Sequence, residues 1–242
     1  MQLLVSVTSA DEAASAIAGG ADIIDAKDPL AGALGAVRLE VLCQIHRAVA
    51  GTRLVTAALG DATSEAAIEK ASREFSAAGA ALVKVGFAGI SAPARVVALI
   101  EAAVEGARDG GVVAVAYADA DRATTVTPRT LIDVAASAGA TGVLLDTIDK
   151  TGPGLRALLS PVALAAWVNE AHEAGLLVAL AGKLRADDVS CVRDAGADVA
   201  GVRGAACEGG RTGRVAAHRV QVLRALCAQS IGATTVPLGA QT

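Results

Sequence analysis

Charged residues interrupt the most apolar stretches of this chain at one repeated offset. Four segments open with Gly-Ala and continue as an apolar run, and their glycines lie 59, 60 and 57 residues apart: Gly20, Gly79, Gly139 and Gly196. Counted from its glycine, each charged residue falls at position +5 or +7: Asp25, Lys27, Lys84, Asp146 and Arg203. Because side chains alternate faces along a strand, offsets of one parity predict that all five charges point the same way. Burying charge is costly, so this convergence indicates a functional site.

The repeats also predict the fold. Four further apolar runs lie between the glycine-led segments: Leu3–Ser6, Arg53–Ala57, Val112–Tyr117 and Leu176–Ala181. Each strand candidate is followed by an alanine-rich stretch of helical composition, such as Asp11–Gly19, Ser64–Ala78, Ala92–Gly106, Pro128–Ala138, Pro161–Ala174 and Arg185–Ala195. Eight strand–helix units predict an α/β protein with a single (β/α)8 TIM barrel over residues 1–230. An open doubly wound sheet is the alternative.

The composition argues against two classes of partner, nucleic acids and membranes. The formal net charge is −4 and no Lys/Arg-rich run or aromatic platform is present, so we expect no nucleic-acid partner. No uncharged apolar stretch reaches membrane-spanning length and the chain enters a strand almost at once, so we expect a cytoplasmic protein without a membrane partner. Residues 231–242 carry no periodicity and are expected to form a flexible tail. The sequence does not decide whether the protein forms a homo-oligomer.

The cysteines and histidines do not suggest a metal site. The four cysteines are widely spaced without a Cys-x-x-Cys pair, which favours reduced, mostly buried thiols: Cys43, Cys191, Cys207 and Cys227. His46, His172 and His218 fall within helical stretches, so helix packing or solvent exposure is favoured over ligation. We therefore expect no metal. No Gly-x-Gly-x-x-Gly follows a strand candidate and aromatic residues are few, so no cofactor is expected either.

Lysine inside a barrel has a specific chemical use. At pH 7 about one free lysine in 2,500 is neutral and nucleophilic, and a pKa lowered by about 3 units raises that fraction to roughly a quarter. Lys27 and Lys84 are expected to suppress one another's charge, so that one amine forms an imine and the other transfers protons. Asp25 and Asp146 would hold protons or stabilise the protonated imine. The alternative is a structural network of ion pairs.

Equal offsets predict equal heights in the barrel. Asp25 and Lys84 should share one layer, with Lys27, Asp146 and Arg203 one layer nearer the C-terminal mouth. Lys150 follows the sixth strand, where it either leans over the mouth or is an ordinary solvated lysine. Another loop, after the fifth strand, contains three charged residues: Asp119, Asp121 and Arg122. These residues are expected to contact substrate or to cap the next helix, and capping is favoured.

Glycine-rich basic loops predict phosphate binding. Barrel enzymes often hold phosphate with the loops after strands seven and eight. Here those loops supply glycines that let backbone N–H groups approach an anion, together with basic side chains: Gly182, Lys183, Arg203, Gly204, Gly209, Gly210, Arg211 and Arg214. A small phosphorylated molecule is therefore the expected ligand.

Eight dispersed motifs resemble the (5-formylfuran-3-yl)methyl phosphate synthase family, from about Gln2 to Cys227. They occur in the family's order, and among them are Ala18-Gly-Gly-Ala-Asp-Ile-Ile-Asp-Ala-Lys-Asp-Pro29, Lys84-Val-Gly86, Leu145-Asp-Thr147 and Gly201-Val-Arg-Gly-Ala-Ala-Cys207. The resemblance implies a lyase of methanofuran biosynthesis that joins two glyceraldehyde 3-phosphate molecules into 4-(hydroxymethyl)-2-furancarboxaldehyde phosphate.

The same resemblance implies roles for individual residues. Lys27 matches the family's Schiff-base lysine and Lys84 its proton acceptor, while Asp25, Asp146 and Lys150 match other charged residues of its site. Two rival functions stay open on sequence alone. One is another Schiff-base aldolase or isomerase acting on triose or pentose phosphates, and the other is a barrel that only binds a phosphorylated metabolite.

Overall fold

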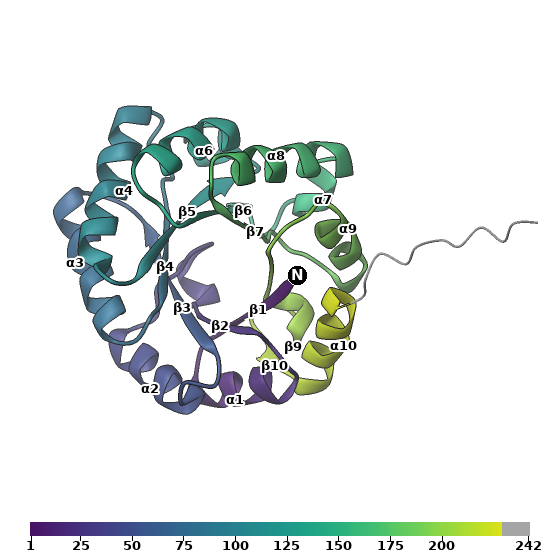
Figure 1. The fold of residues 1–242 in the computed structure, drawn as a ribbon. Coiled ribbons are helices and arrows are strands. Elements are labelled where there is room, and N and C mark those ends of the chain that lie inside the picture. Colours follow the sequence, from purple (N-terminus) through teal and green to yellow (C-terminus); the bar gives the residue numbers. More distant parts are fainter. Residues whose placement is uncertain (229–242) are drawn as a thin grey trace, which may run out of the picture.

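Eight parallel strands close into a barrel in the computed structural model, which describes residues 1–228. The predicted tail, residues 231–242, lies outside the described residues. Figure 1 looks along the barrel, with the strands as an inner ring and the helices as an outer ring. The strands are β1 (Gln2–Val7), β2 (Ile23–Ala26), β3 (Leu54–Asp61), β4 (Leu82–Gly86), β5 (Gly111–Tyr117), β6 (Gly142–Asp146), β7 (Leu177–Leu180) and β8 (Val199–Val202). The predicted single barrel is confirmed, and the open sheet is excluded because β1 pairs with β8.

Helices follow the strands and cover the outside of the barrel. Four of them begin at a serine or threonine whose hydroxyl accepts an N–H of the first turn: Ser9, Ser64, Thr127 and Ser160. The helices are α1 (Ala10–Ala18), α2 (Leu39–Val49), α3 (Glu65–Ala77), α4 (Pro93–Ala107), α6 (Pro128–Ser137), α8 (Pro161–Glu173), α9 (Val189–Asp194) and α10 (Ala217–Ala228). The three histidines lie in helices, as predicted. Of the cysteines, Cys207 and Cys227 are buried, whereas Cys43 and Cys191 are half-buried.

Alternation along the strands separates two apolar clusters. One residue set packs between strands and helices and includes Leu3, Val5 and Ile24. The intervening positions face the barrel interior, where Leu4 and Leu144 pack with the other inward residues. The apolar interior fills the part of the barrel below the charged layers, so the polar residues of the same parity collect near the carboxyl ends of the strands.

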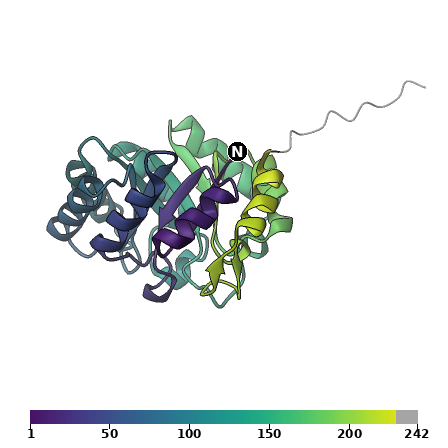
Figure 2. The same ribbon diagram turned by 90° about the horizontal axis from the view of Figure 1, so that it is seen from below.

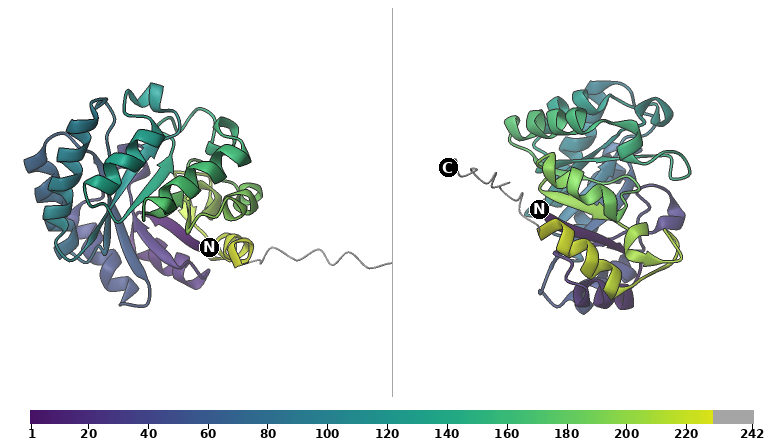
Figure 3. Two further views of the ribbon diagram at one scale, coloured as in Figure 1. Left: turned by 45° about the horizontal axis from the view of Figure 1, so that its top comes forward. Right: turned by 90° about the vertical axis from the view of Figure 1, so that its right-hand side faces the viewer.

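Short elements extend the loops at the C-terminal mouth. They are η1 (Pro29–Ala31), α5 (Ala120–Ala123), α7 (Leu155–Leu158), η2 (Ala186–Asp188), η3 (Gly204–Ala206) and the hairpin of β9 (Cys207–Glu208) and β10 (Arg214–Val215). The hairpin lies at the end of the barrel opposite the N terminus (Figures 2 and 3). No helix within residues 1–228 is both long and apolar enough to cross a membrane.

A close contact fixes the ends of three neighbouring strands at this mouth. The buried Tyr117 hydroxyl donates to Asp61 Oδ1 at 2.8 Å, between the ends of β5 and β3. Burial first, and then the Asp61 carboxylate, raise the pKa of Tyr117, which keeps the hydroxyl protonated as a donor. Gly86 at the end of β4 makes room for this pair, because a Cβ there would lie 2.2 Å from Asp61 Oδ1 and 2.5 Å from the Tyr117 hydroxyl.

Candidate active site

A cavity of about 500 Å³ opens at the C-terminal mouth of the barrel. Eight basic side chains and two acidic ones line it: Lys27, Lys84, Lys150, Lys183, Arg185, Arg203, Arg211, Arg219, Asp25 and Asp146. Of the residues predicted to be catalytic or to bind phosphate, all but Gly209 and Arg214 line this one cavity, including Gly182, Gly204 and Gly210. The excess of positive charge suits an anionic ligand.

Asp25 is held by groups from three other strands. It is fully buried on β2, and its register neighbours on β1 and β3 are Ser6 and Thr56. The Ser6 hydroxyl donates to Oδ2 at 2.8 Å and the Thr56 hydroxyl to Oδ1 at 2.8 Å. Lys84 of β4 forms an ion pair with Oδ1, so the predicted shared layer is confirmed. Every contact favours the carboxylate form.

The pKa values of this buried pair follow from their surroundings. Burial alone would raise the pKa of Asp25, but the Lys84 and Lys27 cations together with the Ser6 hydroxyl hold it below its ordinary value. Burial is the largest cause that lowers the pKa of Lys84, and Lys27 adds to it, whereas Asp25 opposes both. Lys84, which is 5 % exposed, is therefore easier to deprotonate than a free lysine.

A second acid–base pair lies at the end of β6. Asp146 Oδ1 accepts the Thr147 N–H at 2.8 Å and the Lys150 ammonium at 2.6 Å. Burial would raise the pKa of Asp146, but Lys150 and then Lys27 hold it below its ordinary value. The other oxygen, Oδ2, is buried and has no hydrogen-bond partner in the described structure. Such an atom in a cavity wall is suited to a substrate hydroxyl or a proton in transfer.

Lys27 lies between the two pairs. Its backbone N–H donates to the Val7 carbonyl at 3.0 Å, which continues the strand ladder one residue past β2 and keeps the side chain inward. Its charge lowers the pKa of both carboxylates, Asp25 and Asp146, and of the two lysines paired with them, Lys84 and Lys150. Among the cavity lysines within residues 1–228, Lys27 alone makes no side-chain hydrogen bond or ion pair with protein.

Contrary to the prediction, Arg203 does not join the lysine cluster. Its guanidinium donates to both oxygens of Glu12, at 2.6 and 3.1 Å, and to the carbonyls of Ser6, Arg211 and Gly213. The strand ends at Val202 and the backbone of Arg203 leaves the extended region (φ −131°, ψ −67°), so alternation no longer directs the side chain. All five N–H donors are used, which makes Arg203 a support of the site wall.

Sequence reasoning missed Glu12. Only the Ser9-x-x-Glu12 spacing signals it, and that pattern predicts a helix cap rather than a buried partner for an arginine. Its Oε2 accepts the N–H and hydroxyl of Thr8, and Oε1 accepts the Val215 N–H at 3.3 Å. Glu12 thereby connects the β1 loop, β8 and the hairpin.

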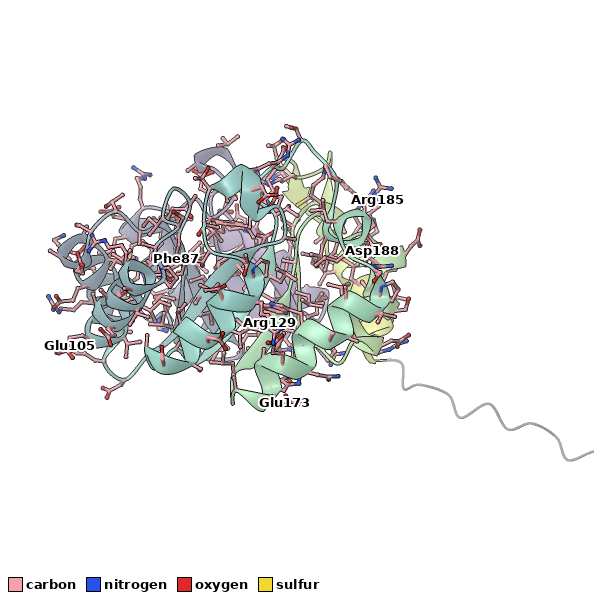
Figure 4. The ribbon with its side chains drawn as sticks, turned by 90° about the horizontal axis from the view of Figure 1, so that it is seen from above. Phe87, Glu105, Arg129, Glu173, Arg185 and Asp188 are labelled. Carbon is pink, nitrogen blue, oxygen red and sulfur yellow. The ribbon has the colours of Figure 1, made fainter. Side chains whose placement is uncertain are left out.

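Two other predicted phosphate ligands hold loops together. Arg211 donates to the carbonyls of Pro29 and Gly32 at 2.5 and 2.7 Å, and so connects the loop after β2 to the hairpin loop. The Lys183 ammonium donates to the Gly152 carbonyl. Within the described residues, the guanidinium groups of Arg185 and Arg219 line the cavity without such a partner, although the sequence did not single them out. Arg185 lies near Asp188 at one edge of the molecule (Figure 4).

The favoured capping role of Asp119 is wrong. Asp119 precedes α5 but its side chain does not cap that helix. Its two oxygens accept the backbone N–H groups of Ile148 and Asp149, at 2.8 and 3.0 Å. Arg122 pairs with Asp149 at 3.0 Å, so the loop after β5 is bound to the loop after β6.

Comparisons with known proteins agree on one family. The family model described as 4-HFC-P synthase matches residues 3–224. The (5-formylfuran-3-yl)methyl phosphate synthase of Methanopyrus kandleri is 40 % identical over 229 residues, which are 92 % of this chain and 97 % of that protein. The protein of the same name from Methanocaldococcus jannaschii is 38 % identical and covers 94 % of this chain and 100 % of its own.

Solved structures resemble the fold at lower identity. A 3-hexulose-6-phosphate synthase superposes with a TM-score of 0.63 at 24 % identity and covers 94 % of this chain and 100 % of its own. The orotidine 5'-phosphate decarboxylase of Pyrococcus horikoshii has a TM-score of 0.65 at 17 % identity, with 95 % and 100 % covered. These similarities support the barrel architecture.

The Arg203–Glu12 pair yields a stability prediction. Glu12→Gln leaves the buried guanidinium without its counter-charge, so the free energy of unfolding should fall by about 3–5 kcal/mol in denaturant titrations at pH 7. As a control, Glu74→Gln removes an exposed pair with Lys70 and should change it by less than about 1 kcal/mol.

The same pair sets a pH dependence. Burial would raise the pKa of Glu12, but the hydrogen bonds and charge of Arg203 and the Thr8 N–H hold it below its ordinary value. A carboxyl whose pKa is lower in the folded protein stabilises it above the unfolded pKa and loses that effect as the pH falls through the folded pKa. The difference in the free energy of unfolding between wild type and Glu12→Gln should therefore shrink as the pH falls. A difference that stays constant with pH contradicts the role of Glu12 as the counter-charge of Arg203.

Proposed function

The chain belongs to the 4-HFC-P synthase family, and from this premise we propose that it condenses two molecules of glyceraldehyde 3-phosphate into 4-(hydroxymethyl)-2-furancarboxaldehyde phosphate. The atoms balance: two C3 phosphates give one C6 monophosphate, one inorganic phosphate and two waters. The reaction needs no net oxidant or reductant. Its product would serve methanofuran biosynthesis.

The state of Lys27 is the observation that carries this proposal. Its amine lacks a protein partner, whereas Lys84 and Lys150 are each paired with a carboxylate. An unpaired amine in a cationic, largely buried site is the one best able to attack an aldehyde and form an imine. We therefore assign the Schiff base to Lys27.

The two acid–base pairs would move the protons. An imine acidifies the adjacent carbon, and Lys84, with its lowered pKa, would remove that proton to leave an enamine. The enamine carbon would attack the aldehyde of the second molecule. Asp146 Oδ2, which is buried and unpartnered, would bind the hydroxyl that leaves as water, and Lys150 would protonate it. Asp25 would hold Lys84 in place rather than transfer protons itself, because both of its oxygens already accept hydrogen bonds from Ser6 and Thr56.

Backbone groups and one arginine would hold phosphate. Within the described residues, the N–H groups of Gly182 and Gly204 make no hydrogen bond to protein, and both glycines line the cavity. Gly182 has φ +97°, a conformation that suits glycine. With Arg203, Arg211 and Lys183 engaged elsewhere, Arg219 on the first turn of α10 would supply charge.

The covalent step predicts a label on Lys27. Borohydride reduction in the presence of glyceraldehyde 3-phosphate should add a triose-derived mass to the peptide that contains Lys27, measured by mass spectrometry. Lys27→Ala should abolish both the label and turnover. Lys70→Ala serves as the control, because Lys70 is exposed on α3 and pairs only with Glu74. A label that survives Lys27→Ala unchanged would remove Lys27 from this role.

The phosphate site predicts a loss of anion affinity. Arg219→Gln removes a charge-assisted hydrogen bond, so binding of inorganic phosphate should weaken about tenfold to a hundredfold in calorimetry. Arg129→Gln is the control, since Arg129 is an exposed arginine of α6 that pairs with Glu170. If Arg219→Gln binds phosphate as tightly as wild type, Arg219 does not contact it.

A further inference from the structure

Lys150 reaches Asp146 from a loop rather than from a strand. The loop of residues 147–154 follows β6, and the Lys150 side chain is 14 % exposed. Its ammonium must nevertheless stay 2.6 Å from Asp146 Oδ1 in order to leave Oδ2 free. A long side chain on an irregular segment loses considerable conformational entropy when it is held in one place, so its backbone has to be fixed by other contacts.

Asp119 provides such a contact on the N-terminal side of Lys150. It lies two residues past β5 and is half-buried. Its two carboxylate oxygens each accept one of two consecutive backbone N–H groups, from Ile148 at 2.8 Å and Asp149 at 3.0 Å. The Ala118 N–H also donates to the Asp146 carbonyl at 2.8 Å, so the two loops stay in register. Two parallel hydrogen bonds to a carboxylate define the backbone orientation as well as its position.

Asp149 fixes the loop on the C-terminal side of Lys150. Its Oδ1 accepts the N–H and hydroxyl of Thr151 and the N–H of Gly152 at 2.7–2.9 Å. That turn is local to the loop, whereas Asp119 belongs to the neighbouring strand. Asp119 therefore ties the turn, and with it Lys150, to the barrel.

We propose that Asp119 is a positioning residue that holds the loop after β6 so that the Lys150 ammonium occupies Asp146 Oδ1 and leaves Oδ2 for the substrate. The inference rests on the proposed function to the extent that Asp146 and Lys150 act on substrate. Asp119 itself does not line the cavity. Its effect on the chemistry passes through Lys150.

The arrangement has an electrostatic consequence. Asp146 faces Lys150 of the loop after β6 and Lys27, which lies one residue past β2. It also interacts with Lys84 of β4, Tyr117 of β5 and Arg211 of the hairpin loop. After burial, Lys150 is the largest influence on the pKa of Asp146, and it lowers that pKa. If the loop loosens and Lys150 withdraws, the pKa of Asp146 should rise. The acidic limb of the rate profile should then move to higher pH.

Asp119→Asn tests the proposal with minimal change of shape. The amide keeps one acceptor oxygen but presents its NH2 group to the second N–H, so one of the two hydrogen bonds is lost. We expect kcat to fall about tenfold to a hundredfold, KM to change by less than about threefold, and the acidic limb to shift upward. Asp121→Asn is the matched control, because Asp121 is an exposed neighbour whose side chain forms no hydrogen bond within the described structure, and it should behave as wild type.

A double variant separates positioning from general stability. In a Lys150→Gln background, Asp119→Asn should cause no further loss of kcat, because the group through which it acts is gone. The proposal is overturned if Asp119→Asn lowers kcat in the Lys150→Gln background by the same factor as in wild type. It is also overturned if the pH profile of the single variant Asp119→Asn is not shifted.

A second readout does not depend on turnover. Lys150 should react faster with acetic anhydride in Asp119→Asn than in wild type, measured by mass spectrometry of its peptide. If wild type makes no furan product, the proposed function fails while this labelling still decides the role of Asp119. Equal labelling of Lys150 in both proteins overturns the positioning role.

Discussion

The buried ion pair of Asp25 and Lys84 is the interaction on which the rest of the site depends. Removing two charges from water is expensive, and their attraction compensates only when the remaining lone pairs are also satisfied. Ser6 and Thr56 meet that condition for Asp25, so four consecutive strands contribute to one charged group. Only a sheet curved into a barrel points these side chains at a common centre, and the fold and the site therefore impose the same geometry.

The basic residues of the mouth divide into three groups. Lys84 and Lys150 are paired with carboxylates and have lowered pKa values, for which burial is the largest cause. Arg203, Arg211 and Lys183 bind protein oxygens and hold the loops in place. Lys27, Arg185 and Arg219 make no such bond within residues 1–228 and are left to meet a ligand. This division of the basic residues supports the proposed reaction, in which phosphorylated aldehydes would form an imine and then lose water and phosphate.

The sequence predicted strand positions better than side-chain contacts. The shared offset from Gly-Ala located Asp25, Lys84 and Asp146 correctly, because alternation along a strand depends only on local backbone geometry. Lys27 kept its predicted direction since its N–H continues the ladder. Arg203 lines the cavity but pairs with Glu12 rather than joining the lysine cluster, because the extended backbone had ended. The contacts of Glu12 and Asp119 join residues far apart in the chain or on separate loops. No periodicity encodes such contacts, so only the three-dimensional structure reveals them.

Product analysis distinguishes furan synthesis from the other reactions of triose phosphates. The protein is incubated with glyceraldehyde 3-phosphate, and substrate, inorganic phosphate and organic products are quantified by mass spectrometry and phosphate assay. We expect a C6 furan aldehyde monophosphate with one inorganic phosphate released for every two triose phosphates consumed, and no such product with Lys27→Ala. Conversion into an isomeric triose phosphate or a hexose bisphosphate without release of phosphate would contradict it.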